Sequence, residues 1–419
     1  MDVRMVMVDK TDGAPTGSPV SGRVAVVGAG IGGLATAAFL ARARVAVTVF
    51  EQAAELREVG AGLIVPPNAV RLLRRLGELD RLREVSVPME VGWEFRRWAD
   101  GSVLFSQRLG AVCERLYGEY CYLAHRADLL SVLRAAVPDE LLHLGTRLVG
   151  IRRRPRDVAL DFADGSSAAV DVVIGADGVH SLVRDAVAPP EPPRFSGLCA
   201  YRCMVPAERA PDFACRPVQT LWLGPGRHLV HYPVSAGRLI NVVAFAPTDD
   251  WLTESWSARG RVEDLAAEFA GWDPRLGELI DAADSTGRWA LFDRDPLPMW
   301  TSGAIALLGD AAHPMFPFFA QGAAQAIEDA AVLARCLADD AGRPEAALAR
   351  YERTRMPRAT EVQRLSRRRQ DSNHLPDGPE QRARDAAFAH EDPLGHNAWL
   401  YGHDAEESLS APSRTRGGR

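Results

Sequence analysis

A glycine-rich turn near the start of the chain is the feature that most restricts its fold. Residues 24–27 are apolar and read as a buried strand, and Gly28, Gly30 and Gly33 follow directly. The first glycine permits a tight turn, the second lets a ligand approach the backbone, and the third lets a helix pack on the strand. We expect that helix over residues 34–42, with its N-terminus forming an anion site. The turn therefore predicts a strand–helix unit of a parallel sheet.

An acidic residue at the end of the next strand indicates what the turn binds. Residues 45–50 form a second apolar run, and Glu51 follows it, 23 positions after Gly28. A carboxylate there accepts hydrogen bonds from the ribose hydroxyls of an adenosine. The unit predicts nucleotide binding, with a plain strand–helix turn as the alternative. It cannot by itself distinguish NAD from FAD.

Two later segments make that distinction. Residues 172–175 form another apolar run followed by Asp177 and Gly178, and residues 304–308 precede Gly309 and Asp310. Alone, each would be an ordinary turn. In this order and spacing, the three segments resemble the FAD-binding signature of the class A (single-component) flavin monooxygenases, the aromatic-ring hydroxylases. The resemblance covers residues 22–405.

The resemblance implies an α/β fold: a Rossmann-like FAD-binding domain, an inserted, mostly antiparallel β-sheet substrate domain and C-terminal helices. It implies that Asp177 lies near the pyrophosphate, that Asp310 holds the ribityl chain, and that Arg126 reaches the cofactor from a helix start. Arg184 would order its loop by pairing with nearby acids. Residues 60–62 and 67–69 would lie beside the flavin ring. The expected FAD contacts are Gly28, Gly30, Ile31, Gly33, Glu51, Gln52, Gly62, Arg126, Asp177, Asp310, Pro317, Gly322 and Ala323.

The loop over residues 313–322 carries the mechanism in such enzymes. A helix rich in strong helix formers begins directly after it. By resemblance, the positive end of that helix points at the flavin N1 and C2 carbonyl, with Gln321 and Gly322 offering main-chain N–H groups. Pro314 would line the face where oxygen reacts. His313 would prop the loop rather than act as a base.

Residues 189–300 are richer in Pro, Trp and strand-like alternation, and we expect them to cover the reactive face of the flavin. Side chains alternate along a strand, so His228 and Tyr232 share one face while His231 points the other way. His228 and Tyr232 are the candidates for contact with a substrate hydroxyl, with a non-catalytic polar pair as the alternative. Arg202 matches a family arginine near the flavin or substrate. These three residues and Pro314 form the expected catalytic set.

The expected organisation follows from these segments. Residues 1–22 form a flexible leader, and residues 23–188 with 301–357 form a discontinuous FAD-binding domain with a β-hairpin insertion near 91–107. Residues 189–300 form the substrate domain, 358–405 a C-terminal helical segment and 406–419 a disordered tail. Pro357 would kink or break the helix expected over 345–369. Arg367, Arg368 and Arg369 read as a solvated face, with a nicotinamide phosphate contact as the alternative.

Bulk properties restrict the partners. The net charge is −6 and the isoelectric point is near 6.0, which predicts no nucleic-acid partner, and no apolar run is long enough to span a membrane. The six cysteines contain no CxxC pair and read as reduced thiols of a cytoplasmic protein, with no metal site. We expect a monomer or homodimer.

The resemblance implies that NADH or NADPH reduces bound FAD, and that O2 then forms a C4a-hydroperoxyflavin which hydroxylates an electron-rich ring. A phenol or hydroxypyridine is the expected substrate. A flavoprotein epoxidase, a Baeyer–Villiger-type oxygenase, a halogenase and a non-catalytic dinucleotide-binding protein are the alternatives. Against the halogenase, this chain lacks the Trp-x-Trp-x-Ile-Pro motif of that enzyme class.

The lid resembles the narrower group of salicylate, 3-hydroxybenzoate, 6-hydroxynicotinate and urate hydroxylases. Unlike many of these, the chain is apolar over residues 63–66, beside the expected flavin site. With Met315, Phe316, Phe318, Phe319 and Trp222 near the pocket, this favours a bulky, lipophilic hydroxyaromatic, as for a biosynthetic tailoring enzyme.

Overall fold

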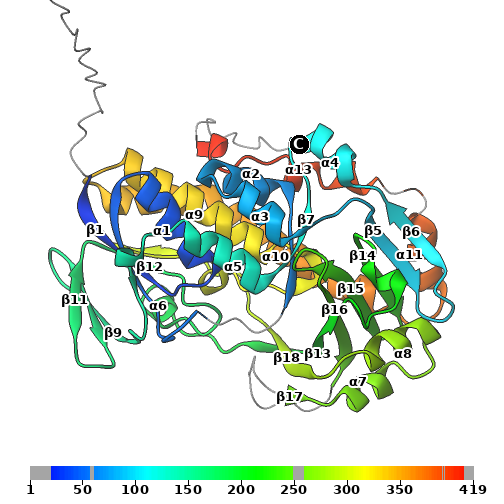
Figure 1. Cartoon of the computed structure of the whole chain (residues 1–419). Coiled ribbons are helices and arrows are strands. Elements are labelled where there is room, and N and C mark those ends of the chain that lie inside the picture. Colours follow the sequence, from blue (N-terminus) through cyan, green and yellow to red (C-terminus); the bar gives the residue numbers. More distant parts are fainter. Residues whose placement is uncertain (1–19, 57–60, 249–258, 389, 391, 410–419) are drawn as a thin grey trace, which may run out of the picture.

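The computed structural model describes residues 20–56, 61–248, 259–388, 390 and 392–409, and within them two large sheets lie side by side (Figure 1). The first sheet has the order β19-β20-β12-β1-β2-β8 and is parallel except for the β19–β20 pair. Its strands are β1 (Val20–Val27), β2 (Val45–Phe50), β8 (Leu142–His143), β12 (Val172–Gly175), β19 (Thr301–Ser302) and β20 (Ile305–Leu307). The predicted parallel sheet is confirmed. Strand β1 begins before position 23, where the sequence placed the end of a leader.

Helices cover one face of this sheet. The glycine-rich turn leads into α1 (Ile31–Arg42), which is buried along most of its length against β2 and α9 (Gly322–Asp339). Helices α2 (Pro67–Leu76), α3 (Leu79–Val85) and α5 (Arg126–Ala135) complete the layer. On the other side, in Figure 1, lie α6 (Leu182–Asp185) and a meander of β9 (Leu148–Arg153), β10 (Val158–Phe162) and β11 (Ser167–Val170).

The second sheet is mostly antiparallel, as predicted. Its order is β17-β18-β13-β16-β15-β14-β5-β6, and only the β14–β5 pair is parallel. The strands are β5 (Gly92–Arg97), β6 (Val103–Gln107), β13 (Arg194–Pro206), β14 (Val218–Gly224), β15 (Arg227–Val234), β16 (Leu239–Pro247), β17 (Arg259–Gly260) and β18 (Thr286–Asp293). The predicted hairpin near 91–107 therefore extends this sheet rather than standing alone. Helices α7 (Val262–Glu268) and α8 (Pro274–Asp281) pack on its outer face.

A third, small sheet links the two large ones. It contains β3 (Gly62–Val65), β4 (Val87–Pro88) and β7 (Tyr122–His125), and α4 (Gly110–Tyr117) follows β6. Strand β7 also contacts β15 of the second sheet, so the turn between β7 and α5 lies where the sheets meet.

The C-terminal part begins with α10 (Pro344–Asn373), which runs without a break through Pro357. Of the predicted kink or break at Pro357, the break is wrong. Proline has no N–H group, so Pro357 cannot donate to the carbonyl of Arg353 one turn earlier. Both residues are exposed, so this carbonyl lies on the solvent side of the helix. After α10 come α11 (Pro379–Phe388), α12 (Pro393–His396), α13 (Ala398–Tyr401) and a short 3-10 helix, η5 (Glu407–Leu409), which occupies the start of the predicted tail.

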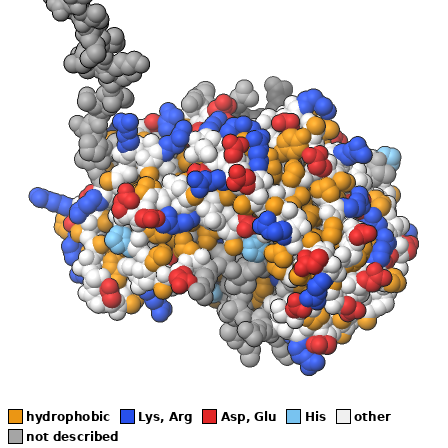
Figure 2. Space-filling view, viewed as in Figure 1, with side chains coloured by type: hydrophobic (Ala, Val, Ile, Leu, Met, Phe, Trp, Pro, Cys, Tyr) orange, Lys and Arg blue, Asp and Glu red, His pale blue; other side chains and the backbone are white. Residues whose placement is uncertain are grey.

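On the face shown in Figure 2, acidic and basic side chains are interspersed. All six cysteines are free thiols, and only Cys215 is exposed. Among the described residues, no helix is long and apolar enough to cross a membrane, and no group of three or more His, Cys, Asp or Glu side chains could hold a metal ion.

Candidate active site

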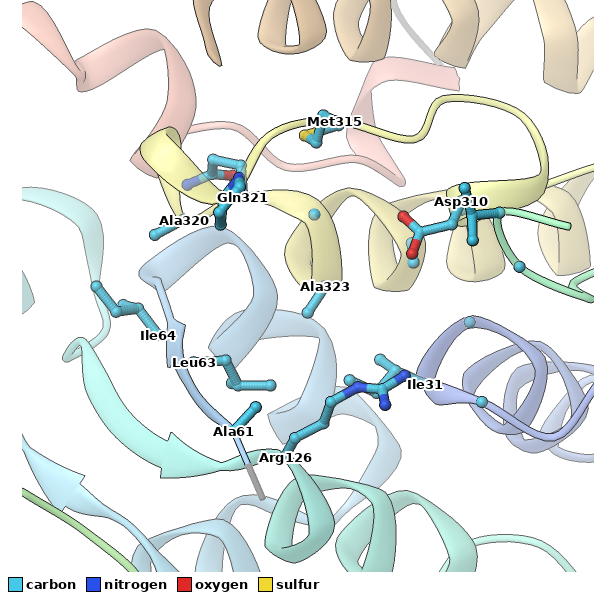
Figure 3. Close-up of a pocket in the computed structure, with 18 of the residues that line it drawn as sticks. Ile31, Ala61, Leu63, Ile64, Arg126, Asp310, Met315, Ala320, Gln321 and Ala323 are labelled. Atoms are coloured by element: carbon cyan, nitrogen blue, oxygen red, sulfur yellow. The ribbon is translucent and has the colours of Figure 1, made fainter. Parts of the chain in front are cut away.

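A cavity of about 1380 Å³ lies between the two large sheets and brings together the three segments that the sequence singled out. Gly28 from the β1–α1 turn, Asp310 after β20 and Gly322 at the start of α9 all line it. Figure 3 shows Asp310 on one wall, with Arg126 and Ile31 opposite and Ala323 beside them. The predicted convergence of these distant segments is confirmed.

The glycine turn has the geometry that a phosphate-binding turn needs. Gly28 has a φ of +100°, and a Cβ there would lie 2.5 Å from the Ala176 carbonyl oxygen. A Cβ on Gly33 would lie 1.9 Å from the Gly28 carbonyl oxygen, so this glycine serves packing, and it does not line the cavity. Gly30 lines the cavity, and a Cβ there would have no protein atom within 4 Å. Of these three glycines, only Gly30 has open space where a side chain would be.

Glu51 at the end of β2 is held in place by two main-chain donors. Its carboxylate accepts from the Ala29 N–H at 2.7 Å and from the Ala53 N–H at 2.8 Å. These bonds fix the carboxylate on the cavity wall, and the exposed Gln52 lies next to it. The position suits an acceptor for ribose hydroxyls.

Asp177 and Asp310 both line the cavity, but Arg184 orders their loops differently from the prediction. Its guanidinium donates to the carbonyls of Asp310 (2.7 Å), Ala311 (2.8 Å) and Val179 (2.9 Å), rather than to carboxylates. The Asp177 carboxylate accepts from Ser181 Oγ at 2.5 Å, and burial raises its pKa. Arg184 thus ties the Asp310 loop to the Asp177 loop through their main chains.

The N-terminus of α9 faces the cavity through Gly322 and Ala323, and no acid lies in its first turn. The preceding Gln321 is buried, and its side chain accepts a hydrogen bond from Asn68 Nδ2 at 3.3 Å. Asn68 and the other residues over 67–69 lie behind the wall, whereas Ala61, Gly62, Leu63 and Ile64 line the cavity. Figure 3 shows Leu63 and Ile64 below this helix end. The positive helix end is therefore free to meet electron-rich atoms.

The loop before α9 contains one correction. Pro314 does not line the cavity; it is buried, and its carbonyl accepts from Gln363 Nε2 at 2.9 Å. Met315 and Pro317 line the wall. His313 props the loop, as predicted, because its Nε2 lies 2.6 Å from Asp329 and its ring packs on Trp300.

The inner face of the second sheet forms the far wall. His228, Val230 and Tyr232 of β15 line the cavity, while His231 packs with Phe213 and Trp222 behind the sheet. The predicted facing of His228 and Tyr232 is therefore confirmed, and the expectation that Trp222 lies near the pocket is wrong. Arg202 on β13 pairs with Val243 on β16, and Val243 pairs in turn with Val230 on β15. Arg202 therefore lies two strands away from Val230 on the same face of the sheet, and it lines the cavity.

The sequence and structure are similar to those of known flavin enzymes. A family model described as FAD binding domain matches residues 22–366. The chain belongs to the FAD-dependent aromatic hydroxylases.

It is 44% identical to a 3-amino-4-hydroxybenzoate 2-monooxygenase, PtnB3, of Streptomyces platensis, over 91% of this chain and 96% of that one. It is 40% identical to a 6-hydroxynicotinate 3-monooxygenase of Pseudomonas fluorescens, over 83% and 90% of the two chains. A structure of a salicylate hydroxylase substrate complex aligns with a TM-score of 0.78 and 29% identity, over 94% and 98% of the chains. This hydroxylase is therefore an FAD-dependent monooxygenase that consumes NAD(P)H and O2.

The residues of the hydroxylase cavity fit FAD. The open space at Gly30 suits the pyrophosphate, and the oriented carboxylate of Glu51 suits the ribose. The N-terminus of α9, which has no acid in its first turn, suits an electron-rich ring edge. Arg126 supplies a cation: burial lowers its pKa, and Asp310 acts in the opposite direction.

Burial shifts the pKa values of the groups on the far wall. It lowers the pKa of His228 well below its usual value and raises that of Tyr232 well above, so both are neutral at pH 7. It also lowers the pKa of Arg202 to about 10, and the Arg202 guanidinium lies over Trp289, 4.5 Å from the ring centroid. A neutral imidazole, a phenol donor and a desolvated cation therefore share one wall.

Several lining residues were not found from the sequence. Trp289 and Asn373 carried no motif, and Arg369 belonged to the cluster that we expected to be solvated. Arg367 and Arg368 do form ion pairs, with Asp293 and Glu361 respectively, whereas Arg369 lies over the Phe95 ring and reaches the cavity. An α-helix has 3.6 residues per turn, so three consecutive arginines of α10 point in different directions, and Arg369 points towards the cavity.

Proposed function

We propose that this hydroxylase acts on a small aromatic ring that carries a hydroxyl and a carboxylate, of the aminohydroxybenzoate class. The observation that carries the proposal is the shared wall of His228, Tyr232 and Arg202, with the 44% identity to the aminohydroxybenzoate monooxygenase as support. A desolvated guanidinium such as Arg202 is stabilised by an anionic ligand. This revises the lipophilic substrate that residues 63–66 favoured. Leu63, Ile64 and Pro66 would pack on rings, while the substrate acid lies on the sheet.

We further propose how the cofactor is held. Gly28, Gly30 and Ile31 would bind the pyrophosphate at the start of α1, with Asp177 beside it. Glu51 and Gln52 would bind the adenosine ribose, and Arg126 and Asp310 the ribityl region. Gly62, Pro317, Gly322 and Ala323 would surround the flavin ring. Bound FAD supplies the redox chemistry, by taking hydride from NAD(P)H and activating O2.

The protein would position and activate the ring. His228 is neutral, so it can accept the proton of the substrate hydroxyl, and Tyr232 keeps its proton and can donate a hydrogen bond to that oxygen. The oxyanion formed makes the ring carbons more nucleophilic. Phe318, Phe319 and Met315 would exclude water from the same space. Pro314 plays no direct part in this proposal, because it lies outside the cavity.

The test is a comparison of matched substrates. NAD(P)H oxidation and product mass are measured with 3-amino-4-hydroxybenzoate and with 2-aminophenol, which lacks the carboxylate. We expect a gain of one oxygen, and a kcat/KM at least tenfold higher for the acid. Arg202→Met should abolish this preference. Equal rates for both compounds, or hydrogen peroxide as the only product with the acid, would contradict the proposal.

We also propose a cytoplasmic monomer or homodimer without nucleic-acid or membrane partners. The interspersed charges in Figure 2, the net charge of −6 and the free thiols support it. Light scattering of the purified protein, with and without DNA or anionic vesicles, tests it.

A further inference from the structure

His228 makes a direct contact with a second imidazole that no motif indicated. Its Nδ1 lies 2.6 Å from Nε2 of His374, and the ring centroids are 4.7 Å apart. His228 comes from β15, and His374 directly follows the last residue of α10. Phe245 stacks on His228 at 4.4 Å and Phe318 meets it edge-on at 5.3 Å, so apolar rings fix the pair.

The protons of the pair can be placed from its neighbours. Burial lowers the pKa of His374 to about 4, and a hydrogen bond between its ring and the main chain of Gln370 acts in the opposite direction. Because Nε2 of His374 faces His228, the ring N–H group that donates to the Gln370 main chain is Nδ1–H. Nε2 of neutral His374 therefore carries a lone pair and accepts from Nδ1–H of His228. The remaining nitrogen of His228, Nε2, then carries a lone pair, and His228 lines the cavity.

The two imidazoles differ in how well they can hold a positive charge. His228 is fully buried and close to Arg369, and both conditions disfavour its cation. His374 is partly exposed and caps the C-terminus of a 30-residue helix, where the helix dipole favours a cation. A proton accepted by His228 is therefore more stable on His374.

We propose that His228 and His374 form a two-imidazole relay that draws the proton of the substrate hydroxyl out of the cavity. The inference rests on the proposed function. As the substrate O–H bond breaks, its electron pair stays on oxygen and an Nε2–H bond forms on His228. At the same time the Nδ1–H bond of His228 breaks and an Nε2–H bond forms on His374, which becomes an imidazolium. The reverse transfer returns the proton to the product oxygen.

His374 acts through His228, as a positioning residue that also accepts the proton. A single buried imidazole would keep the positive charge beside Arg369. The relay moves this charge to the end of α10, so the oxyanion forms at a lower electrostatic cost than with His228 alone. The groups that face the pair are Arg369 and the Gln370 carbonyl from α10, Phe245 from β16, and Phe318 from the loop before α9.

Two variants separate orientation from proton transfer. In His374→Gln, the amide oxygen can accept from Nδ1–H of His228 but cannot take its proton; in His374→Leu, both properties are lost. His143→Gln, at an exposed position on β8, is the matched control. With 3-amino-4-hydroxybenzoate, we expect both His374 variants to lose at least tenfold in kcat at pH 7 and to recover as the pH rises. The control should match the wild type. Wild-type kcat in His374→Gln would overturn the relay.

A second measurement needs no substrate. Nitrogen-15 NMR of the FAD-loaded protein, assigned with His228→Asn and His374→Gln, reports the tautomer of each ring. We expect a proton on Nδ1 of both His228 and His374 at pH 7, and any other tautomer overturns the relay. If the tautomers are as expected but no hydroxybenzoate is oxygenated, the proposed substrate class fails and the pair stands.

Discussion

Strand alternation decides the function of two histidines that lie three positions apart. His228 faces the cavity and His231 the opposite core, because side chains of a strand point to alternate faces. The residue type is the same, but only His228 meets the space for a ligand. Burial lowers the pKa of both rings, so the pKa shift alone does not identify the functional one.

His228→Asn should leave FAD content unchanged, because FAD would contact other residues, and should lower kcat about a hundredfold, because a proton acceptor is lost. Flavin absorbance per protein and steady-state rates with 3-amino-4-hydroxybenzoate check this. The exposed His143→Asn is the control. An unchanged kcat would show that His228 is not the acceptor.

Two glycines of the turn serve different purposes: Gly33 allows close packing of the protein, and Gly30 leaves room for a ligand. Gly33→Ala places a Cβ 1.9 Å from a carbonyl oxygen and should cost about 1–3 kcal/mol of unfolding free energy. Gly30→Ala meets no protein atom within 4 Å, so its stability without FAD should be unchanged, while its Kd for FAD rises at least tenfold. Urea unfolding and fluorescence titration distinguish the two effects. Equal FAD affinity in Gly30→Ala and wild type would place the pyrophosphate elsewhere.

Helix α9 is held from behind by a buried ion cluster. Arg355 of α10 lies 2.5 Å from Glu328 and 2.8 Å from Asp329, and all three side chains are at most 1% exposed. Asp329 also holds His313 at 2.6 Å. The cluster thus fixes α9 and its preceding loop relative to α10, and with them the helix end that faces the cavity.

Arg355→Met should lower the unfolding free energy by about 3–5 kcal/mol, because it removes the guanidinium from buried Asp329 and leaves buried Glu328 with Arg358 as its remaining arginine partner. Arg350→Met is the matched control: Arg350 pairs with Asp339 and Asp340 at the surface and should contribute less than about 1 kcal/mol. Urea denaturation followed by circular dichroism measures both. Similar losses would mean that the cluster adds little to stability.

For the whole molecule, buried histidines make stability depend on pH. Burial lowers the pKa of His231 to about 3 and of His374 to about 4, below the unfolded value near 6.5. The unfolded chain therefore binds more protons between these values. Stability is fully present above pH 6.5 and is lost as the pH falls from 6.5 towards 3.

His231→Phe should reduce this acid sensitivity, because neither ring nitrogen of His231 has a hydrogen-bond partner and the ring packs against Phe213 and Trp222. We expect the difference in unfolding free energy between pH 7 and pH 4.5 to shrink by about 1–3 kcal/mol. Urea titrations of both proteins at both pH values measure it. An unchanged difference would assign the acid sensitivity to other groups.

Local patterns determined the parts of this protein whose chemistry lies in neighbouring residues. The G-x-G-x-x-G turn, Glu51 and Asp310 could be placed because each directly follows an apolar strand, and parallel strands end at one edge. Only the tertiary structure decided the position and contacts of side chains whose partners are distant in the sequence. Pro314 was misplaced because its loop turns it towards Gln363 of α10, and Arg184 was misjudged because carbonyls came within its reach. The His228–His374 contact joins residues 146 positions apart, and hydrogen bonding over such a separation leaves no periodic trace in a single sequence.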